Sequence, residues 1–300
     1  MTVPLPADRP ARLTVGVISA GRVGAVLGAA LGRAGHRIAA VSAVSDASRR
    51  RAELLVPSAT VAPPDEVASA ASLLVLAVPD DELGPLVLGL ANTHAVARGT
   101  LVVHTSGASG TEILAPLADA GALPLALHPA MTFTGTEVDL QRLDGAAWGV
   151  TAEEILRPVG EALVIEMGGE PAWIPPERRA LYHAGLVVGA NNLITLVTQS
   201  AALLNEAGVE HPERMLGPLL SASLDNALRF GDAGLTGPVA RGDAETLREH
   251  LRVLARTAPE ITAAYVAMAR LTADRALAAG LLAPDDAGAL LAALADGYPR

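Results

Sequence analysis

Seven histidines are the side chains of this sequence best suited to moving a proton near neutral pH, because the chain has no lysine and no cysteine. All 22 basic residues are arginines, which excludes a lysine Schiff base, a P-loop lysine and a lysine general acid. His128 ends an apolar run in LHPAMTFTG, and His183 lies early in a long helical pattern. Asn191 follows His183 two turns later on roughly the same helix face. We therefore expect His128 or His183 to donate a proton and Asn191 to orient a substrate.

Two further polar residues could hold a substrate. Ser106 follows an apolar run in HTSGASG, where its hydroxyl could bond a carboxylate or a carbonyl group, although a simple Ser/Gly turn fits the pattern equally well. Arg241 in VARGD could bind an anionic substrate or pair with Asp243, the expected N-cap of the next helix. The remaining histidines do not stand out: we expect a structural role for His104 and surface positions for His36, His94, His211 and His250.

A glycine-rich segment near the N-terminus, TVGVISAGRVGAVLGAAL (Thr14–Leu31), has the pattern of a strand, a tight turn and the start of a helix. Gly21 and Gly24 match the second and third glycines of G-x-G-x-x-G, and Ser19 replaces the first. Serine is small enough for this turn if its φ is negative. The helix N-terminus offers N–H groups and a positive dipole end to phosphates. We favour a dinucleotide-binding loop over a simple tight turn. The expected cofactor contacts there are Ser19, Ala20, Gly21, Arg22, Val23 and Gly24.

The segment after the second predicted strand, VSAVSDASRRR, bears on which dinucleotide is bound. An NAD-type site places an acidic residue here, and Asp46 fits that description. Ser45, Ser48 and the run Arg49–Arg51 could instead receive a 2′-phosphate through charge-assisted hydrogen bonds, or the arginines could form a solvated helix face. We favour NADP over NAD, with Ser45 and Arg49 at the phosphate. The residues expected beside the nicotinamide, at later strand ends, are Val78, Pro79 and Thr105.

The secondary-structure elements that must position these residues are alternating strands and helices in the first part of the chain and helices in the second. Apolar strands at 12–19, 36–44, 72–78, 100–105, 123–129 and 146–152 alternate with helical patterns at 23–34, from 47 and at 153–167. This alternation predicts an α/β fold with a doubly wound, mostly parallel sheet. From 178 onward the periodicity is helical, with expected helices at 178–207, 212–230, 243–254, 258–279 and 284–295. We expect a Rossmann-type NAD(P)-binding domain over 12–172 and an all-helical substrate and dimerisation domain over 177–300.

Composition narrows the class of protein further. The chain of 300 residues has 51% hydrophobic side chains and a net charge of −10, which fits a well-packed protein of two domains and opposes general nucleic-acid binding. Without cysteine there is neither a disulfide nor a thiolate metal site, and we expect no bound metal. The first residues, MTVPLPADRPARL, lack the apolar core of a signal peptide, so we expect a cytoplasmic protein.

The apolar stretch LYHAGLVVGANNLITLVTQSAALL raises the question of a membrane span. His183, Asn191, Asn192 and Gln199 interrupt it, so an uninterrupted apolar run of about 20 residues is missing. A Gly-x-x-x-Gly spacing within it allows close helix contact instead. We therefore expect no membrane span but the buried central helix of the second domain, which a dimer could share.

Six motifs, in this order, carry a resemblance to a known family: GVISAGRVG, AVPDDEL, VVHTSGASG, LHPAMTF, YHAGLVVGANN and LTGPVARGD. The chain resembles an uncharacterised family of Rossmann-like NAD(P)-binding proteins with a C-terminal helical domain of unknown function. More broadly, it is similar to the superfamily of 6-phosphogluconate dehydrogenase, ketopantoate reductase, pyrroline-5-carboxylate reductase and prephenate dehydrogenase. The resemblance implies a nicotinamide cofactor in the first domain and a homodimer formed through the second. Members of the close family are often encoded beside pantothenate-synthesis genes, which implies a ketopantoate-like substrate.

One position departs from that superfamily. In its hydroxyacid-dehydrogenase branches a lysine one turn before an asparagine acts as the acid, and aligning that asparagine with Asn191 places Val187 there. His183, a further turn back, is the expected substitute. The leading hypothesis is an NADP-dependent oxidoreductase that reduces a small anionic 2-oxo acid or imine, with Ser106 and Asn191 orienting the substrate and Arg241 holding its carboxylate. The alternatives are a non-catalytic nucleotide-binding sensor or partner protein of a biosynthetic pathway, and a structural dimer that has lost nucleotide binding.

Overall fold

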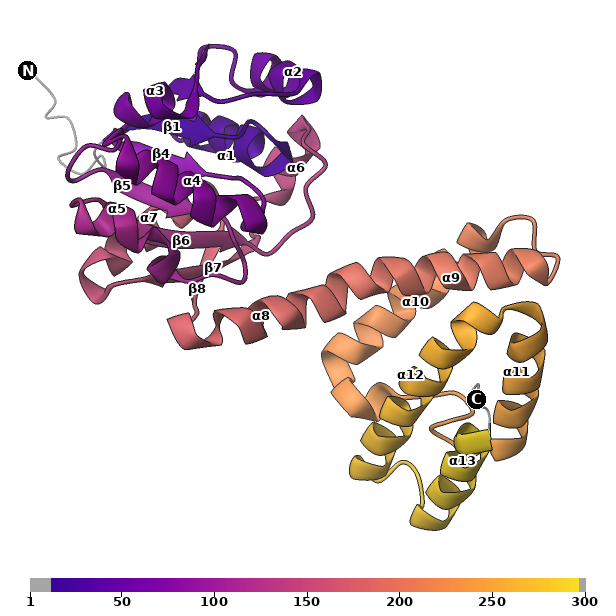
Figure 1. The fold of residues 1–300 in the computed structure, drawn as a ribbon. Helices are drawn as coiled ribbons and strands as arrows, with labels where there is room; N and C mark the ends of the chain where they lie inside the picture. The colour runs from indigo at the N-terminus through magenta and orange to yellow at the C-terminus, as the bar shows by residue number, and fades with distance from the viewer. Residues whose placement is uncertain (1–11, 297–300) are drawn as a thin grey trace, which may run out of the picture. The chain divides into compact units, whose positions relative to one another are not determined.

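The computed structural model describes residues 12–296, which form two compact units (Figure 1). The first unit runs from Met1 to Gly189 and the second from Ala190 to Arg300. Contacts group α8 (Arg179–Leu186) with the first unit, whereas the sequence pattern groups it with the helical region that follows. Residues 1–11, on which the expectation about a signal peptide chiefly rests, lie outside the described residues.

An eight-stranded sheet forms the centre of the first unit. Its strands are β1 (Thr14–Ile18), β2 (Arg37–Val41), β3 (Thr60–Val61), β4 (Leu73–Leu76), β5 (Leu101–His104), β6 (Leu123–Pro129), β7 (Ala147–Ala152) and β8 (Glu170–Trp173). The spatial order is β3-β2-β1-β4-β5-β6-β7-β8, and every neighbouring pair is parallel except β6 with β7. The predicted doubly wound, mostly parallel sheet is confirmed. In such sheets, ligands bind where the strand order reverses, which here is between β1 and β4.

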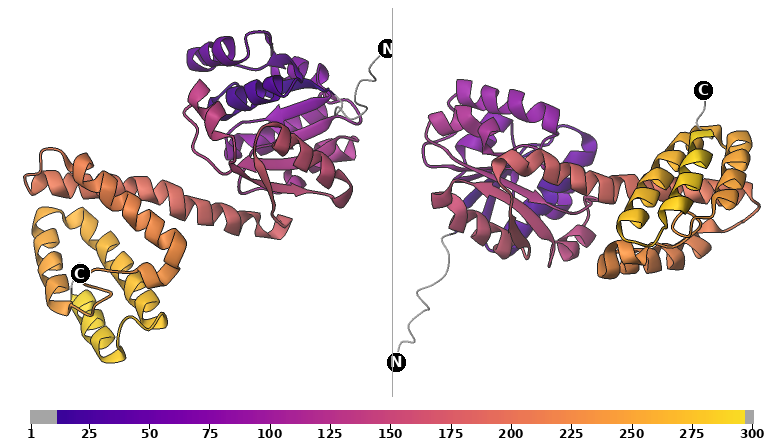
Figure 2. Two further views of the ribbon diagram at one scale, coloured as in Figure 1. Left: turned by 180° about the vertical axis from the view of Figure 1, so that it is seen from behind. Right: turned by 90° about the horizontal axis from the view of Figure 1, so that it is seen from below.

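Helices cover both faces of this sheet (Figure 2). They are α1 (Arg22–Arg33), α2 (Asp46–Leu55), α3 (Pro64–Ser69), α4 (Asp80–Asn92), α5 (Ala115–Asp119), α6 (Glu137–Arg142) and α7 (Arg157–Glu166). Successive side chains of a strand point to opposite faces. In β4, Val75 therefore packs in a core with Leu27 of α1 and Leu163 of α7, whereas Leu74 packs in a second core with Val87 of α4.

The second unit is helical throughout its described part. Its helices are α9 (Asn192–Glu206), α10 (Pro212–Phe230), α11 (Ala244–Thr257), α12 (Pro259–Ala278) and α13 (Pro284–Asp296). The last three pack around a buried core that includes Leu247, Val266 and Leu290. Proline opens α10 and α12, where a helix has no intrahelical use for the missing N–H. The helices predicted from 212 onward are confirmed.

The predicted helix 178–207 consists of three consecutive segments: α8, a π-helical turn at Val187–Asn191, and α9. The helical stretch Pro176–Glu206 is long and apolar enough to cross a membrane, with a mean hydropathy of 1.4 and 0% of its most apolar window buried. The expectation of a buried central helix is therefore wrong for the single chain. The reason is that α9 packs against α10 on one side and leaves Leu193, Ile194 and Leu196 exposed on others.

His36 is also placed differently from the expected surface position, since it is only 6% exposed. Its Nδ1 accepts a hydrogen bond from the backbone N–H of Leu13 at 3.1 Å, so Nε2 carries the ring proton and donates to Glu166 Oε2 at 2.7 Å. Glu166 ends α7, 130 residues further along the chain. Local sequence could not indicate this contact. His94, His211 and His250 are exposed, as expected.

Candidate functional site

The turn between β1 and α1 consists of Ser19, Ala20 and Gly21 alone. Ser19 has a φ of +76°, so the expectation of a negative φ is wrong. A left-handed conformation costs a non-glycine residue about 1–2 kcal/mol. Ser42 at the end of β2 stabilises it, because its Oγ accepts the N–H of Ser19 at 2.8 Å and its carbonyl accepts the N–H of Ala20 at 2.7 Å.

Close packing brings the start of α1 to the end of β1. A Cβ atom at Gly24 would overlap the carbonyl oxygen of Ser19 and lie 3.1 Å from Cγ1 of Val17. The N-cap of α1 is Gly21, which has no side chain to occupy the first N–H groups of the helix. These groups and the positive end of the helix dipole are therefore available to a phosphate.

A cavity of about 490 Å³ lies at this turn. Its walls come from the β1–α1 turn, the end of β2, α2, and the loop into α4. Five of the predicted cofactor contacts line it: Ser19, Ala20, Gly21, Ser45 and Val78. The other predicted contacts lie outside its lining in the described structure: Arg22, Val23, Gly24, Arg49, Pro79 and Thr105.

The arginine that lines this cavity is Arg51. The predicted Arg49 is exposed and lies outside the lining, because it sits on another side of α2. Ser45 is the N-cap of α2, and its Oγ accepts the backbone N–H of Ser48 at 3.1 Å. The competing acidic residue, Asp46, is exposed and is not part of the lining.

A loop after β6 lies against Arg51 and against Arg22 at the start of α1. Asp139 is fully buried, and its Oδ2 accepts the N–H of Thr134 at 2.8 Å and that of Gly135 at 2.7 Å. Gly135 has a φ of +80°, and a Cβ atom there would lie 2.7 Å from Nε of Arg51 and 3.1 Å from Cα of Arg22. The segment TFTGTEVD therefore flanks the nucleotide-type cavity, a placement that sequence reasoning missed.

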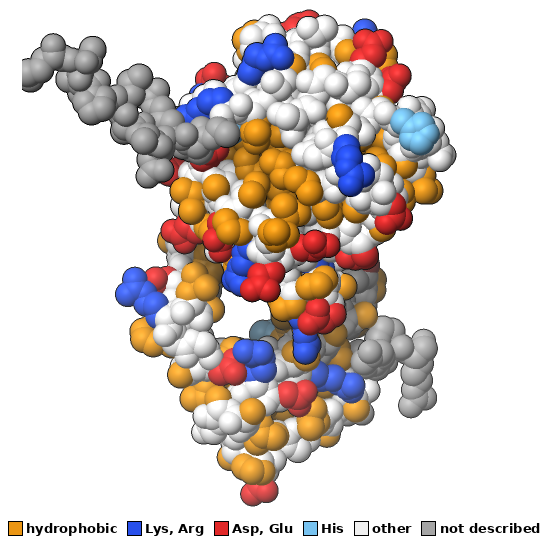
Figure 3. Space-filling model, turned by 90° about the vertical axis from the view of Figure 1, so that its left-hand side faces the viewer, with side chains coloured by type: hydrophobic (Ala, Val, Ile, Leu, Met, Phe, Trp, Pro, Cys, Tyr) orange, Lys and Arg blue, Asp and Glu red, His pale blue; other side chains and the backbone are white. Residues whose placement is uncertain are grey.

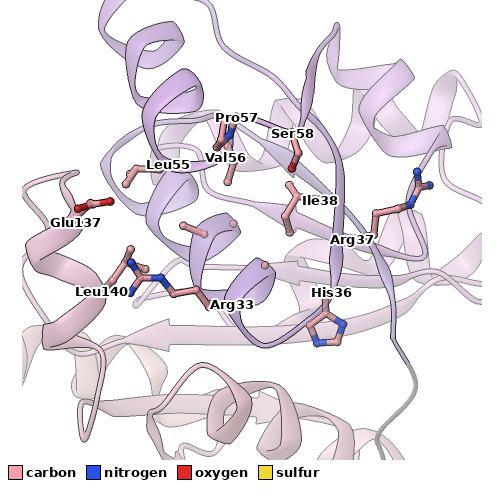
Figure 4. Close-up of a pocket in the computed structure, with 13 residues that line it drawn as sticks. Arg33, His36, Arg37, Ile38, Leu55, Val56, Pro57, Ser58, Glu137 and Leu140 are labelled. Carbon is pink, nitrogen blue, oxygen red and sulfur yellow. The ribbon is translucent and has the colours of Figure 1, made fainter.

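A second cavity of about 490 Å³ lies between the later part of α1, the start of β2 and α6 (Figure 4). Arg33, His36, Arg37 and Leu140 are among its lining residues. None of the predicted site residues lines it. It is also at the opposite end of β2 from Ser42, away from the strand ends at which ligands of such sheets bind.

His128 and His183 come together in the first unit. His128 lies on β6 opposite Gly149 of β7, and its ring centroid is 5.8 Å from that of His183 on α8, with the rings 76° apart. Nδ1 of His128 is 2.9 Å from the hydroxyl oxygen of Tyr182. Gly107 packs directly below both imidazoles, since a Cβ atom there would lie 2.6 Å from Cδ2 of His183 and 3.0 Å from Nε2 of His128. The structure thus brings together the two histidines that were predicted as alternative proton donors, with Tyr182 as an unpredicted third member.

Arg179 lies next to this cluster and is only 1% exposed. It was not among the site residues predicted from the sequence. Its guanidinium donates to three backbone carbonyls: Nε to Ser109 at 2.9 Å, Nη1 to Gly149 at 3.0 Å, and Nη2 to Ser106. Within residues 12–296 no carboxylate lies at ion-pair distance from it. Burial lowers its pKa, yet a guanidinium keeps its charge under all ordinary conditions.

Ser106 belongs to a tight turn at the end of β5. It is buried, its Oγ accepts the N–H of Ser109 at 3.2 Å, and its carbonyl accepts from Arg179. These are the contacts of the Ser/Gly turn that the sequence allowed. His104 supports the turn from below, because Nδ1 accepts the N–H of Ser106 at 3.2 Å and Nε2 donates to the carbonyl of Gly110 at 2.8 Å. The expected structural role of His104 fits this geometry.

The surroundings of the cluster shift the pKa values of His128 and Tyr182 in opposite directions. Burial, followed by the charges of Arg179 and His183, lowers the pKa of His128 from 6.5 to about 4, against an opposing effect of Asp80. Burial also raises the pKa of Tyr182. At neutral pH, His128 is therefore an uncharged imidazole and Tyr182 an uncharged phenol.

Asn191 and Arg241 belong to the second unit. Asn191 ends the π-helical turn and has an exposed side chain. Arg241 is exposed in the turn before α11. Asp243 is the N-cap of α11, as expected, and its Oδ1 and Oδ2 accept the backbone N–H and the hydroxyl of Thr246 at 3.0 and 2.7 Å.

Comparisons with known proteins agree with this architecture. A Bacteroides fragilis protein assigned as an NADP oxidoreductase is 21% identical over 88% of this chain and 98% of that chain, with a TM-score of 0.74. An imine reductase from Pseudomonas sp. is 20% identical over 95% and 100% of the two chains, with a TM-score of 0.64. Pyrroline carboxylate reductase from Plasmodium falciparum, with NADP bound, is 11% identical over 95% and 98%, with a TM-score of 0.57. These likenesses establish the fold.

Family comparisons cover most of the sequence, although no curated protein matches it significantly. Residues 4–129 match the family described as Rossmann-like domain, and residues 146–272 match a domain of unknown function, DUF2520. The predicted resemblance to a Rossmann-like family with a C-terminal domain of unknown function is confirmed. The chain therefore carries a Rossmann-like domain followed by a domain of the DUF2520 family.

Proposed function

We propose that the protein is an NADP-dependent oxidoreductase that reduces the C=O or C=N bond of a small anionic molecule. The observation that carries the proposal is that the strand ends of one sheet bear both a dinucleotide-type cavity, after β1, and the His128–His183 cluster, around the ends of β5 and β6. Ligands of open α/β sheets bind at this edge. The similar structures include an imine reductase and a pyrroline carboxylate reductase with NADP bound, which supports the same class of chemistry.

The residues at the glycine turn fit a phosphorylated dinucleotide. The start of α1 suits a pyrophosphate because its N–H groups are not capped by a side chain. Arg51, with Ser45 and Ser48 in the same wall of the cavity, suits a 2′-phosphate. When bound, the cofactor supplies the hydride. Our proposal places the 2′-phosphate nearer Arg51 than Arg49.

The proposed substrate is a 2-oxo acid of the ketopantoate type or an imine that carries a carboxylate. Arg179 supports an anion, because this fixed buried charge has no carboxylate at ion-pair distance among residues 12–296 and gives the space above Gly107 a positive potential. Glu112 and Asp80 offset part of its charge. Ser106 remains a predicted substrate contact from the first unit. Asn191 and Arg241 remain predicted contacts from the second.

The first test is a fluorescence titration with NADPH and NADH. Removing the cationic partner of the 2′-phosphate in Arg51→Ala should raise the Kd for NADPH on the order of 10-fold, from the loss of a charge-assisted hydrogen bond, while the Kd for NADH stays unchanged. Arg49→Ala is the matched control, since it removes an exposed arginine two residues away in the same helix. Equal losses for both nucleotides would contradict the assignment of Arg51. If neither nucleotide binds the wild-type protein, the reductase proposal is wrong.

The second test follows NADPH oxidation with ketopantoate, other 2-oxo acids and cyclic imines. Turnover of one class supports the oxidoreductase and identifies the bond reduced. Val187, in the place of the superfamily's lysine, is the observation that favours the alternative of a non-catalytic sensor. Tight NADPH binding without turnover of any of these compounds supports that alternative.

We also propose that the protein is a cytoplasmic homodimer joined through its helical domain. Large apolar side chains are exposed along α9 and α10, including Ile194, Leu219, Leu224, Leu228 and Phe230. Figure 3 shows that hydrophobic side chains also gather in a patch in the upper part of the face that it draws. A continuous apolar helix surface is typical of an interface. A second copy of the chain would also account for the exposed apolar face of Pro176–Glu206 without a membrane.

A further inference from the structure

The hydroxyl of Tyr182 lies beside the ring of His128 in the first unit. Its oxygen is 2.9 Å from Nδ1 of His128. A phenol O–H is a stronger hydrogen-bond donor than the N–H of a neutral imidazole, and a bare imidazole nitrogen is a stronger acceptor than a phenol oxygen. The Tyr182 hydroxyl therefore donates to Nδ1 of His128.

This direction of donation fixes the tautomer of His128. A neutral imidazole has one N–H and one bare nitrogen. Because Nδ1 accepts a hydrogen bond from the Tyr182 hydroxyl, the ring proton of the neutral imidazole must be on Nε2. Among residues 12–296, Nε2 has no hydrogen-bond partner, and it faces the Gly107 backbone beside His183.

The surroundings of His128 also oppose a second ring proton. Burial lowers the pKa of His128 most strongly. Arg179 and His183 on α8 and His104 on β5 also disfavour the cationic form, whereas Asp80 at the start of α4 acts against them. His128 is thus suited to donating a hydrogen bond as a neutral ring, and is poorly suited to being the cation that gives its proton away.

We propose that Tyr182 is a positioning residue that holds His128 as the Nε2–H tautomer, so that His128 donates a hydrogen bond to the substrate atom that gains charge and His183 delivers the proton. This inference rests on the proposed reductase function. It extends that function by giving the two histidines different roles.

These two roles account for the electron pair and the proton that the reduction moves. As the substrate carbon of C=O or C=N gains a hydride, the π electron pair moves onto the oxygen or nitrogen. Nε2–H of His128 stabilises the developing charge there. Protonated His183 then breaks one N–H bond, its proton forms the new O–H or N–H bond, and the neutral ring regains a proton from solvent. His183 is half-buried, so that its ring has access to water.

The test is Tyr182→Phe, which removes the hydroxyl and keeps the ring that packs edge-on against His128. Nitrogen-15 NMR of histidine-labelled protein reports the tautomer directly, with His128 assigned from His128→Gln. We expect Nε2–H in the wild type, and a shift toward Nδ1–H or a mixture in Tyr182→Phe. We also expect kcat to fall by roughly 10-fold, as for other residues that orient a reacting group, with the KM for NADPH unchanged.

Tyr265→Phe is the matched control. Tyr265 makes the same contact with another histidine, His250, at 2.8 Å in the second unit, and removing its hydroxyl should change neither kcat nor the tautomer of His128. An Nδ1–H tautomer in the wild type, or an unchanged tautomer in Tyr182→Phe, overturns the inference even if the protein is a reductase. A tautomer that shifts as expected in a protein that reduces nothing overturns the proposed function and, with it, the donor role, leaving the hydrogen bond as a structural contact.

Discussion

His104 is a buried residue whose titration couples the stability of the fold to pH. It is 0% exposed, and both of its ring nitrogens are hydrogen-bonded within the turn that follows β5. Burial lowers its pKa from 6.5 to about 4. Between these two values the unfolded chain binds a proton at this position and the folded chain does not. The free energy of unfolding must therefore decrease as the pH falls from about 6.5 to about 4.

Urea unfolding at pH 7 and pH 5 measures this effect. His104 should cost the wild type on the order of 2 kcal/mol at pH 5, because each unit of pKa shift is worth 1.36 kcal/mol. His128 acts in the same direction, so the total loss should be larger. His104→Asn should weaken the pH dependence, whereas His94→Asn, which changes an exposed residue with a φ of +51°, should not. An identical pH dependence in the wild type and His104→Asn contradicts the assignment.

Some site residues could be predicted from the sequence and others could not. His128 and His183 were accessible because each stands out locally, one at a strand end and one early in a helix. Tyr182 and Arg179 were not, since the contact of Tyr182 with His128 and those of Arg179 with two backbone carbonyls join segments that meet only in the folded unit. The positive φ of Ser19 was also hidden, because the hydrogen bonds that stabilise it come from Ser42 on the neighbouring strand.

Among the elements, α8 is held to the sheet chiefly by polar contacts of Arg179. The guanidinium joins α8 to the carbonyl of Gly149 on β7 and to two carbonyls of the turn after β5. An uncompensated buried polar group costs about 1–3 kcal/mol. Removing this side chain would leave three backbone carbonyls without their hydrogen-bond donor and would create a cavity. The free energy of unfolding should therefore fall by more than it does for an ordinary surface substitution.

Arg179→Ala should therefore lower the free energy of unfolding by on the order of 3 kcal/mol, measured by urea denaturation. The matched control is Arg178→Ala, which removes the preceding arginine from an exposed position and should change stability by less than about 0.5 kcal/mol. Equal small effects of the two substitutions would show that water or another side chain replaces the guanidinium.

Elements were predictable to the extent that they carry their own pattern. The strand β4 is a continuous apolar run, and β5 is apolar up to its last residue, His104. Helix α10 starts at Pro212 and ends before Gly231, so local sequence indicates all three elements. In contrast, β3 has two exposed residues and β8 is partly exposed, and both exist because a neighbouring strand offers a free edge. The π-helical turn at Val187–Asn191 has no signal in composition, since its residues continue the helical pattern on either side.

At the scale of the whole molecule, the apolar surface of α9 and α10 has to be reconciled with a chain of net charge −10. Fully burying a leucine side chain is worth about 1.5–3 kcal/mol, so a few such residues on each of two copies can offset the entropy of association. Leu228 is 80% exposed on α10, and Leu224, one turn earlier, is exposed as well. A second copy of the chain is the occupant that our proposal assigns to this surface.

Light scattering coupled to size exclusion tests this assignment. The wild type should elute with the mass of two chains, and Leu228→Glu should shift it toward one chain, because two buried carboxylates without cationic partners oppose association. Leu54→Glu places the same charge at a residue that is 77% exposed on α2 of the first unit and should leave the dimer intact. A monomeric wild type contradicts the homodimer. Recovery of the wild type with the membrane fraction would instead assign the apolar helix Pro176–Glu206 to a lipid environment, and the cytoplasmic location would be wrong.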